Sequence, residues 1–250
     1  MEIVIYTALG VGCATILGAI IGFLFKNLSQ KFNDMVLGFA SGIMLCAAVV
    51  GLIIPSFSVQ DKFSVVVAII GILCGALFLN LIDRFVPHAH NLMGKDLEEH
   101  QNTRINKTML FVLAIAIHNF PEGLSAGVGF GTGNTVQAIS IAVGIALQNI
   151  PEGMVIIAPM VLAGISKKKT LLIAFATGFV EILGTLIGYL AANISAMFLP
   201  FLLAFAGGTM LYIISDEMIP ETHSHGNQTL ATYSLLVGFC VMLVIDFFLG

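Results

Sequence analysis

The sequence has little charge and no tryptophan. Only 10% of its 250 residues are charged and 58% are hydrophobic, which gives a mean hydropathy of +1.03. A soluble domain of this length needs far more polar surface, so the composition predicts a polytopic membrane protein. Because tryptophan is missing, any aromatic belt at the membrane surface must consist of tyrosine and phenylalanine.

Signals for several other classes of protein are also missing. There is no C-x-x-C spacing, and every cysteine lies in an apolar run, so we expect small buried hydrophobic residues at Cys13, Cys46, Cys74 and Cys240. The net charge of −4 includes no basic stripe, so nucleic acid is not an expected partner. Residues 3–25 are too long for the apolar core of a signal peptide and lack a basic start.

The apolar residues form eight runs long enough to cross a bilayer, for which a helix needs about 20 residues. The runs cover residues 3–25, 34–57, 63–86, 107–131, 135–161, 170–193, 199–219 and 230–249. The longest polar stretch is 87–106, and nothing resembles a separate soluble domain. The sequence therefore predicts an all-α protein with a single transmembrane domain over residues 1–250.

Basic residues predict the orientation of these spans. Of the ten lysines and arginines, nine fall on one side of the predicted membrane and only Lys62 falls on the other. Since basic loops stay in the cytoplasm, both termini are predicted to lie outside and the 87–106 loop inside. We expect a multi-pass protein of the plasma (inner) membrane that is surrounded by lipid bilayer, and the sequence leaves a homodimer open.

Spans two and seven share a sequence pattern. Residues 37–45 (LGFASGIML) resemble residues 203–211 (LAFAGGTML), and each span then reaches an Ile-Pro pair, at 54–55 and at 219–220. Similar sequence in spans that run in opposite directions is typical of the inverted repeats of transporters. We therefore predict that spans one to three and six to eight form an inverted repeat around spans four and five.

The most unusual polar residues lie within spans four and five. The segments HNFPEG at 118–123 and QNIPEG at 148–153 share the pattern N-x-P-E-G. In both, the first residue and the glutamate are four apart, so they lie on one face of a helix. Each proline is expected to kink its helix and free a carbonyl group, which is tolerated at membrane depth only where it faces protein, water or an ion.

Buried glutamates indicate which ligand this region binds. A charge at the bilayer centre costs about 2.5–3.5 kcal/mol, so Glu122, Glu152 and Glu181 together cost about 8–10 kcal/mol if ionised and unpaired. No lysine or arginine lies at a matching depth, which leaves protonation or a bound cation. Carboxylates, amide oxygens and one imidazole suit zinc, iron, nickel or copper, and the lack of thiolates argues against Cu(I).

The remaining histidines fall in loops that are predicted to be cytoplasmic, which suggests an exit route for a metal ion. Together with nearby acidic residues, the candidate exit ligands are Asp83, His88, His90, Asp216, Glu217, Glu221, His223 and His225. His100 lies in the same 87–106 loop. Ordinary solvated loop residues are the alternative explanation for this group.

The paired motifs and eight spans resemble the ZIP (Zrt/Irt-like) metal transporters along the whole chain, the prokaryotic branch most of all. The resemblance implies a binuclear site inside the membrane, with one ion on His118, Glu122, Gln148 and Glu152. A second ion would use Asn119, Asn149 and Glu181, with Glu122 and Glu152 as bridges. Many members have a histidine and an acidic residue where this chain has Gln148 and Asn149, so we expect a weaker or auxiliary second position.

These features together predict uptake of divalent metal ions into the cytoplasm. Zn²⁺ is the expected substrate, with Cd²⁺, Fe²⁺ and Mn²⁺ as further candidates and no organic cofactor. We do not expect an enzyme, because an intramembrane metalloenzyme typically carries H-E-x-x-H, and only one histidine lies in the membrane. The main alternative is a proton-coupled carrier of a small organic solute, in which the glutamates relay protons.

Overall fold

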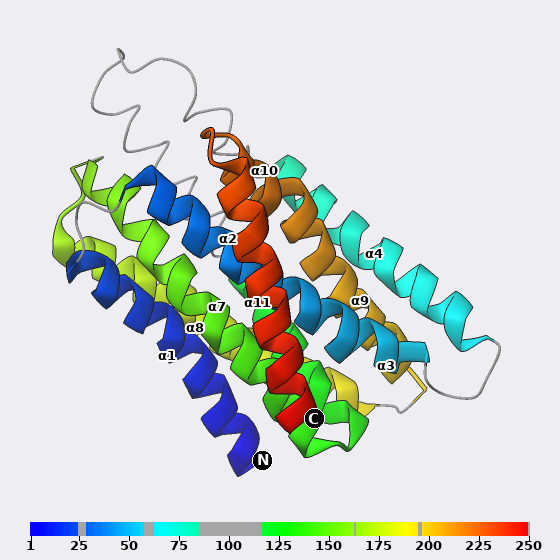
Figure 1. Ribbon diagram of the computed structural model, residues 1–250. Coiled ribbons are helices and arrows are strands. Elements are labelled where there is room, and N and C mark those ends of the chain that lie inside the picture. The colour runs from blue at the N-terminus through cyan, green and yellow to red at the C-terminus, as the bar shows by residue number, and fades with distance from the viewer. Residues whose placement is uncertain (25–28, 58–62, 86–116, 163, 195–196, 250) are drawn as a thin grey trace.

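The computed structural model describes residues 1–24, 29–57, 63–85, 117–162, 164–194 and 197–249, and every regular element in them is a helix (Figure 1). Seven helical segments are long and apolar enough to cross a membrane, and they coincide with seven of the predicted spans. The eighth, predicted over 107–131, is helical over residues 117–129, while 107–116 lie outside the described residues. The prediction of an all-α polytopic membrane protein is confirmed.

Helix ends lie close to the predicted span ends. The helices are α1 (Glu2–Leu24), α2 (Gln30–Cys46), η1 (Ala47–Ile53), α3 (Ile54–Phe57), α4 (Ser64–Phe85), η2 (Phe130–Thr132), α7 (Thr135–Leu162), α8 (Lys167–Ile194), α9 (Leu199–Ile213), η3 (Ile214–Met218), α10 (Ile219–His223) and α11 (Gln228–Leu249). α1 begins and α11 ends at the same end of the bundle (Figure 1). That arrangement agrees with an even number of crossings.

Glycines let the helix backbones approach one another closely. A side chain at Gly18 of α1 would collide with the backbone of Ile150 in α7, and one at Gly184 of α8 would collide with Phe120. Small residues of this kind support helix association in membranes, where lipid provides no hydrophobic drive between helices. Ile150 and Phe120 are the variable residues of the two N-x-P-E-G motifs, so α1 packs on one motif and α8 on the other.

The packing of the helices has a two-fold relation. α1 packs on α7 and α8 on the helix 117–129, while α4 packs on α9 and α11 on α2. The offset that relates residues 37–45 to 203–211 also relates Gly18 to Gly184. α2 and α3 run from the upper to the lower end of Figure 1, and α9 and α10 return in the opposite direction. These directions and pairings agree with the predicted inverted repeat.

Both middle helices of the repeat contain a π-helical segment. η1 separates α2 from α3, and η3 separates α9 from α10. In each case the following α-helix has proline as its second residue, which removes one backbone donor just after the wider π turn. Such segments are frequent at functional sites, and η3 carries Asp216 and Glu217.

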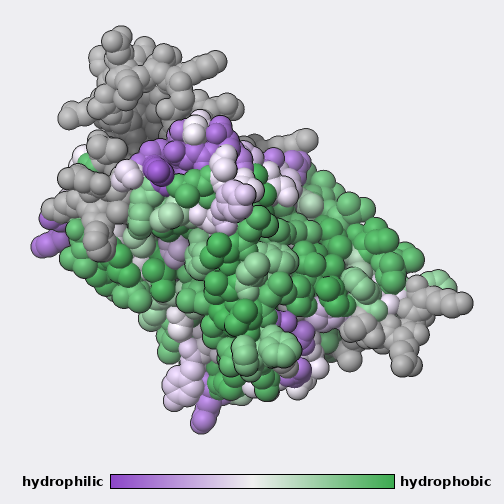
Figure 2. Space-filling view, in the orientation of Figure 1, coloured by the Kyte–Doolittle hydropathy of each residue, from purple (hydrophilic) through white to green (hydrophobic). Residues whose placement is uncertain are grey.

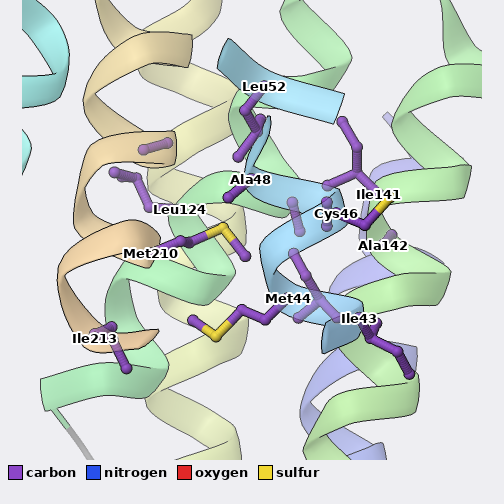
Figure 3. Packing of buried hydrophobic residues seen from close by; sticks show 14 of the residues in the cluster. Ile43, Met44, Cys46, Ala48, Leu52, Leu124, Ile141, Ala142, Met210 and Ile213 are labelled. Carbon is purple, nitrogen blue, oxygen red and sulfur yellow. The ribbon is translucent and has the colours of Figure 1, made fainter. Parts of the chain in front are cut away.

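The main hydrophobic core lies where α2 and η1 pass between α9 and α7. Figure 3 shows Ile43 and Met44 of α2 beside Ile141 of α7 on one side and Met210 of α9 on the other, and all four side chains are fully buried. Leu124 joins the same cluster from the helix 117–129. Apolar side chains therefore fill most of the space between α2, α9 and the helices that carry the motifs, and Gly51 of η1 also approaches Ile141 closely.

The outer surface of the bundle is also apolar, and polar residues gather at the upper end near α2 and α10 (Figure 2). The expectation of buried cysteines is correct for Cys46 and wrong for Cys13 and Cys240, which are exposed. The reason is that an outward face that contacts lipid is as apolar as the interior. Apolar sequence context therefore does not distinguish the two faces of a membrane helix.

Candidate metal centre

The polar residues of the two motifs and of span six are buried within the bundle. The helix 117–129 provides His118, Asn119 and Glu122, α7 provides Gln148, Asn149 and Glu152, and α8 provides Glu181. Glu152 is half-buried, His118 is 8% exposed, and the other five side chains have no exposed surface. Three helices thus carry the seven residues that the sequence selected, and all seven side chains are at least partly buried.

The motif glycines set how closely the neighbouring helices approach. The residues before them, Pro121 and Pro151 included, lie in continuous helix, so neither proline ends its span. A side chain at Gly123 would collide with the carbonyl of Glu181, and one at Gly153 with the carbonyl of Thr15. The absence of a side chain at both positions therefore places α8 and α1 directly against the polar residues.

A chain of hydrogen bonds joins α1, α7 and α8. Thr15 Oγ1 of α1 donates to Glu181 Oε2 at 3.0 Å, and Asn149 Nδ2 donates to Glu181 Oε1. Asn149 Nδ2 also donates to the carbonyl of Val11 at 3.2 Å, and Gln148 Nε2 donates to Asn149 Oδ1 at 2.5 Å. Both oxygens of Glu181 and both polar atoms of the Asn149 side chain therefore have partners.

Other buried polar atoms have no such partners. Among the described residues, no hydrogen bond reaches either carboxylate oxygen of Glu122, either side-chain atom of Asn119, Gln148 Oε1 or Glu152 Oε2. A buried polar atom without a partner costs about 1–3 kcal/mol, and a charged one costs more. These oxygens form a set that a bound cation would satisfy.

His118 faces a residue that sequence reasoning assigned to the exit route. His118 Nε2 lies 2.8 Å from Glu217 Oε1, and both side chains are largely buried. Glu217 lies on the π-helical segment η3, so one of the candidate exit residues is next to the motif histidine. The link between spans four and seven was not visible in the sequence, because the two residues are far apart along the chain.

The glutamates influence one another electrostatically. The Glu122 carboxylate is close enough to those of Glu152 and Glu181 for electrostatic repulsion. The Glu152 carboxylate also interacts electrostatically with His118 and Glu217. Concentrated negative charge in a medium of low dielectric constant attracts a cation strongly. In the described ranges, however, no three His, Cys, Asp or Glu side chains converge closely enough to enclose a metal ion. A metal at this position would need amide ligands or rotated side chains.

The remaining candidate exit residues are distributed unevenly. His88, His90 and His100 lie outside the described residues, as does the side chain of Asp83, while Asp216 is exposed on η3. The prediction that His223 lies in a loop is wrong, because α10 continues to that residue. His223 Nδ1 lies 2.8 Å from the carbonyl of Ile219 and its Nε2 lies 3.1 Å from Thr232 Oγ1, so hydrogen bonds engage both nitrogens.

Sequence reasoning also missed the partner of His225. The Asp34 carboxylate of α2 is buried, and its oxygens lie 3.1 Å from His225 Nδ1 and 2.8 Å from Asn227 Nδ2. Glu221 Oε1 lies 3.9 Å from the other ring nitrogen of His225. These contacts join the start of α2 to the turn after α10. An isolated acidic residue at the start of a span gave no signal for this role.

Comparison with known proteins gives a consistent result. A family model described as ZIP Zinc transporter matches residues 87–246, which include both motifs and Glu181. The zinc transporter GufA of Myxococcus xanthus is 40% identical over 96% of this chain and 96% of its own length. The zinc transporter ZIPB of Bordetella bronchiseptica is 35% identical over 95% of this chain and 78% of its own length. The zinc transporter ZupT of Chlorobaculum parvum is 35% identical over 93% of this chain and 92% of its own length.

Proposed function

Because this chain belongs to the ZIP zinc transporter family, we propose that it carries Zn²⁺ across the membrane into the cytoplasm. The observation that supports this most is the set of buried oxygen atoms without partners on Glu122, Gln148 and Glu152. Hydrogen-bonding solutes would require matched donors and acceptors, whereas a cation needs only oxygen and nitrogen ligands. Cd²⁺, Fe²⁺ and Mn²⁺ are further candidate substrates by the same ligand chemistry. No feature of the centre calls for an organic cofactor or a catalysed reaction.

The primary ion is proposed to bind His118, Glu122, Gln148 and Glu152. Two carboxylates would neutralise the ion, one imidazole would favour zinc over calcium or magnesium, and the Gln148 oxygen would complete four ligands. His118 must leave Glu217 to join this set. Glu217 would then be free to receive the ion from His118 in the following step, which gives the pair a role in transfer.

From Glu217 the ion is proposed to move toward the end of the bundle where α10 lies. Asp216 and Glu221 continue in that direction, and Asp83, His88 and His90 would receive the ion nearer the cytoplasm. The motion is proposed to slide or rock the helices that carry the motifs against α2 and α9. The contact between these groups consists mostly of apolar side chains, and the methionines among them are flexible enough to repack.

Zinc uptake by the purified full-length protein in proteoliposomes tests this function. We expect uptake of Zn²⁺ that saturates with concentration. We expect His118→Ala to reduce it by at least about 10–100-fold, because even a partner that only orients a ligand contributes that much. A zinc-sensitive dye inside the vesicles measures the uptake, and empty vesicles are the control. Failure of the wild-type protein to take up any divalent metal ion would favour the proton-coupled carrier of an organic solute.

The membrane orientation can be measured separately by cysteine labelling. After the native cysteines are replaced, we expect Thr135→Cys to react with a membrane-impermeant maleimide added to intact cells. Ser166→Cys, beside the basic Lys167–Lys169 segment, should react only after the cells are lysed. Both positions are exposed: Thr135 is the first residue of α7, and Ser166 lies between the other end of α7 and the start of α8. The opposite labelling pattern would reverse the proposed direction of uptake.

A further inference from the structure

We infer that the second metal position implied by the family is replaced in this chain by a hydrogen-bonded bridge, so that the centre holds a single ion. The bridge consists of Thr15, Glu181, Asn149 and Gln148, in that order. The inference rests on the proposed function, because it concerns how many ions the transport site holds.

The orientation of the Asn149 amide is fixed by its neighbours. The carbonyl of Val11 can only accept a hydrogen bond, so the amide nitrogen, and not the oxygen, must face it. The same nitrogen donates to Glu181, which leaves the amide oxygen directed to Gln148 Nε2. The one atom of Asn149 able to bind a metal is therefore already engaged. A cation beside Asn149 would meet an N–H group.

Glu181 is satisfied without a metal ion. Its two oxygens accept hydrogen bonds from different helices, one from Thr15 in α1 and one from Asn149 in α7. A hydrogen bond to a charged group contributes about 1.5–3 kcal/mol, so two of them offset much of the cost of burying this carboxylate. Glu122 is equally buried, but among the described residues its only neighbouring donor is the Gln148 side chain, and no hydrogen-bond geometry is met at either of its oxygens. Glu122 is therefore the buried carboxylate whose charge a bound cation would stabilise most.

The backbone keeps the bridge in place. A side chain at Gly123 would strike the Glu181 carbonyl, and one at Gly153 would strike the Thr15 carbonyl. These close approaches fix α8 and α1 relative to the two motifs, and with them the positions of Thr15 and Glu181. Thr15 and Glu181 also occupy equivalent places in the inverted repeat, since they differ by the same offset as Gly18 and Gly184. The bridge thus spans the two halves of the repeat.

Zinc stoichiometry of the purified full-length protein tests the inference directly. Equilibrium dialysis of the wild type in detergent should saturate at one ion per chain. Asn149→Asp should saturate at two, because aspartate cannot donate to Val11 or Glu181 and adds a second carboxylate beside Glu181 that a cation would neutralise. Without zinc this variant should melt at a lower temperature than the wild type, and zinc should raise its melting temperature more than it raises that of the wild type.

Thr185→Val is the matched control. Thr185 is as buried as Thr15 and donates at 3.0 Å to the backbone carbonyl of Glu181 rather than to its carboxylate, so its removal should leave the stoichiometry at one. Two ions bound by the wild type would overturn the single-ion inference while leaving metal transport intact. One ion bound by Asn149→Asp would also overturn it. Wild-type protein that neither binds nor transports zinc would instead overturn the proposed function.

Discussion

Zinc uptake should fall by at least about 100-fold when Glu122 is replaced by glutamine, while the protein should remain as stable as before. Even partners that only orient a metal ligand contribute about 10–100-fold to affinity, and Glu122 is proposed to touch the ion itself. The unpaired carboxylate costs about 2.5–3.5 kcal/mol in the membrane when ionised, and an amide lacks most of that cost. Loss of transport without loss of stability is typical of a binding residue.

Proteoliposome uptake and thermal unfolding in detergent, both measured on Glu122→Gln, check this result. Glu2→Gln removes the same charge at the exposed start of α1 and should change neither quantity. The combination of Glu122→Ala with Glu152→Ala should abolish uptake completely, because both proposed carboxylate ligands are lost. Uptake that survives the double replacement would show that these glutamates do not bind the transported ion.

Alanine at Gly18 should disrupt the bundle although it adds only one methyl group. The added carbon would lie on the carbonyl of Ile150, between the asparagine and the proline of the second motif. Overpacking of this kind costs about 1–3 kcal/mol, and backbone is less able to move aside than a side chain. We therefore expect a lower melting temperature together with weaker zinc uptake, because α1 would be displaced from α7.

Gly10→Ala provides the contrast in the same helix. A side chain at Gly10 has no atom of the described residues within 4 Å, so the substitution meets no obstacle. Alanine is the better helix former by about 1 kcal/mol, which predicts a melting temperature equal to or above that of the wild type. Equal destabilisation by the two substitutions would mean that the contact between α1 and α7 does not limit stability.

The spans were predictable because a bilayer imposes a length and a composition that the sequence displays directly. The motif residues were predictable for a related reason, since polar groups are rare where lipid is the solvent. The hydrogen-bond partners of those residues were harder to predict from the sequence. Thr15 is a small hydroxyl in an apolar helix, and only the repeat offset that relates it to Glu181 could have selected it.

Contacts between distant spans account for the remaining differences. Nothing local predicts that Glu217 reaches His118, because that depends on how η3 turns the side chain toward the helix 117–129. The end of span seven was predicted too early, since Glu221 and His223, the polar residues that follow the predicted end, lie on α10. A polar run in a membrane protein can thus continue a helix where it lines the interior.

The two-fold relation among the helices bears on the ancestry of the protein. Two copies of a three-span unit, inserted into a membrane in opposite directions, would form the pairings of α4 with α9 and of α11 with α2. In such a dimer every ligand would appear twice. The two halves of the predicted repeat differ in this chain, with threonine at position 15 where the other half has glutamate at 181. A fused chain can change one half alone, and this permits an asymmetric pathway with distinct outer and inner ends.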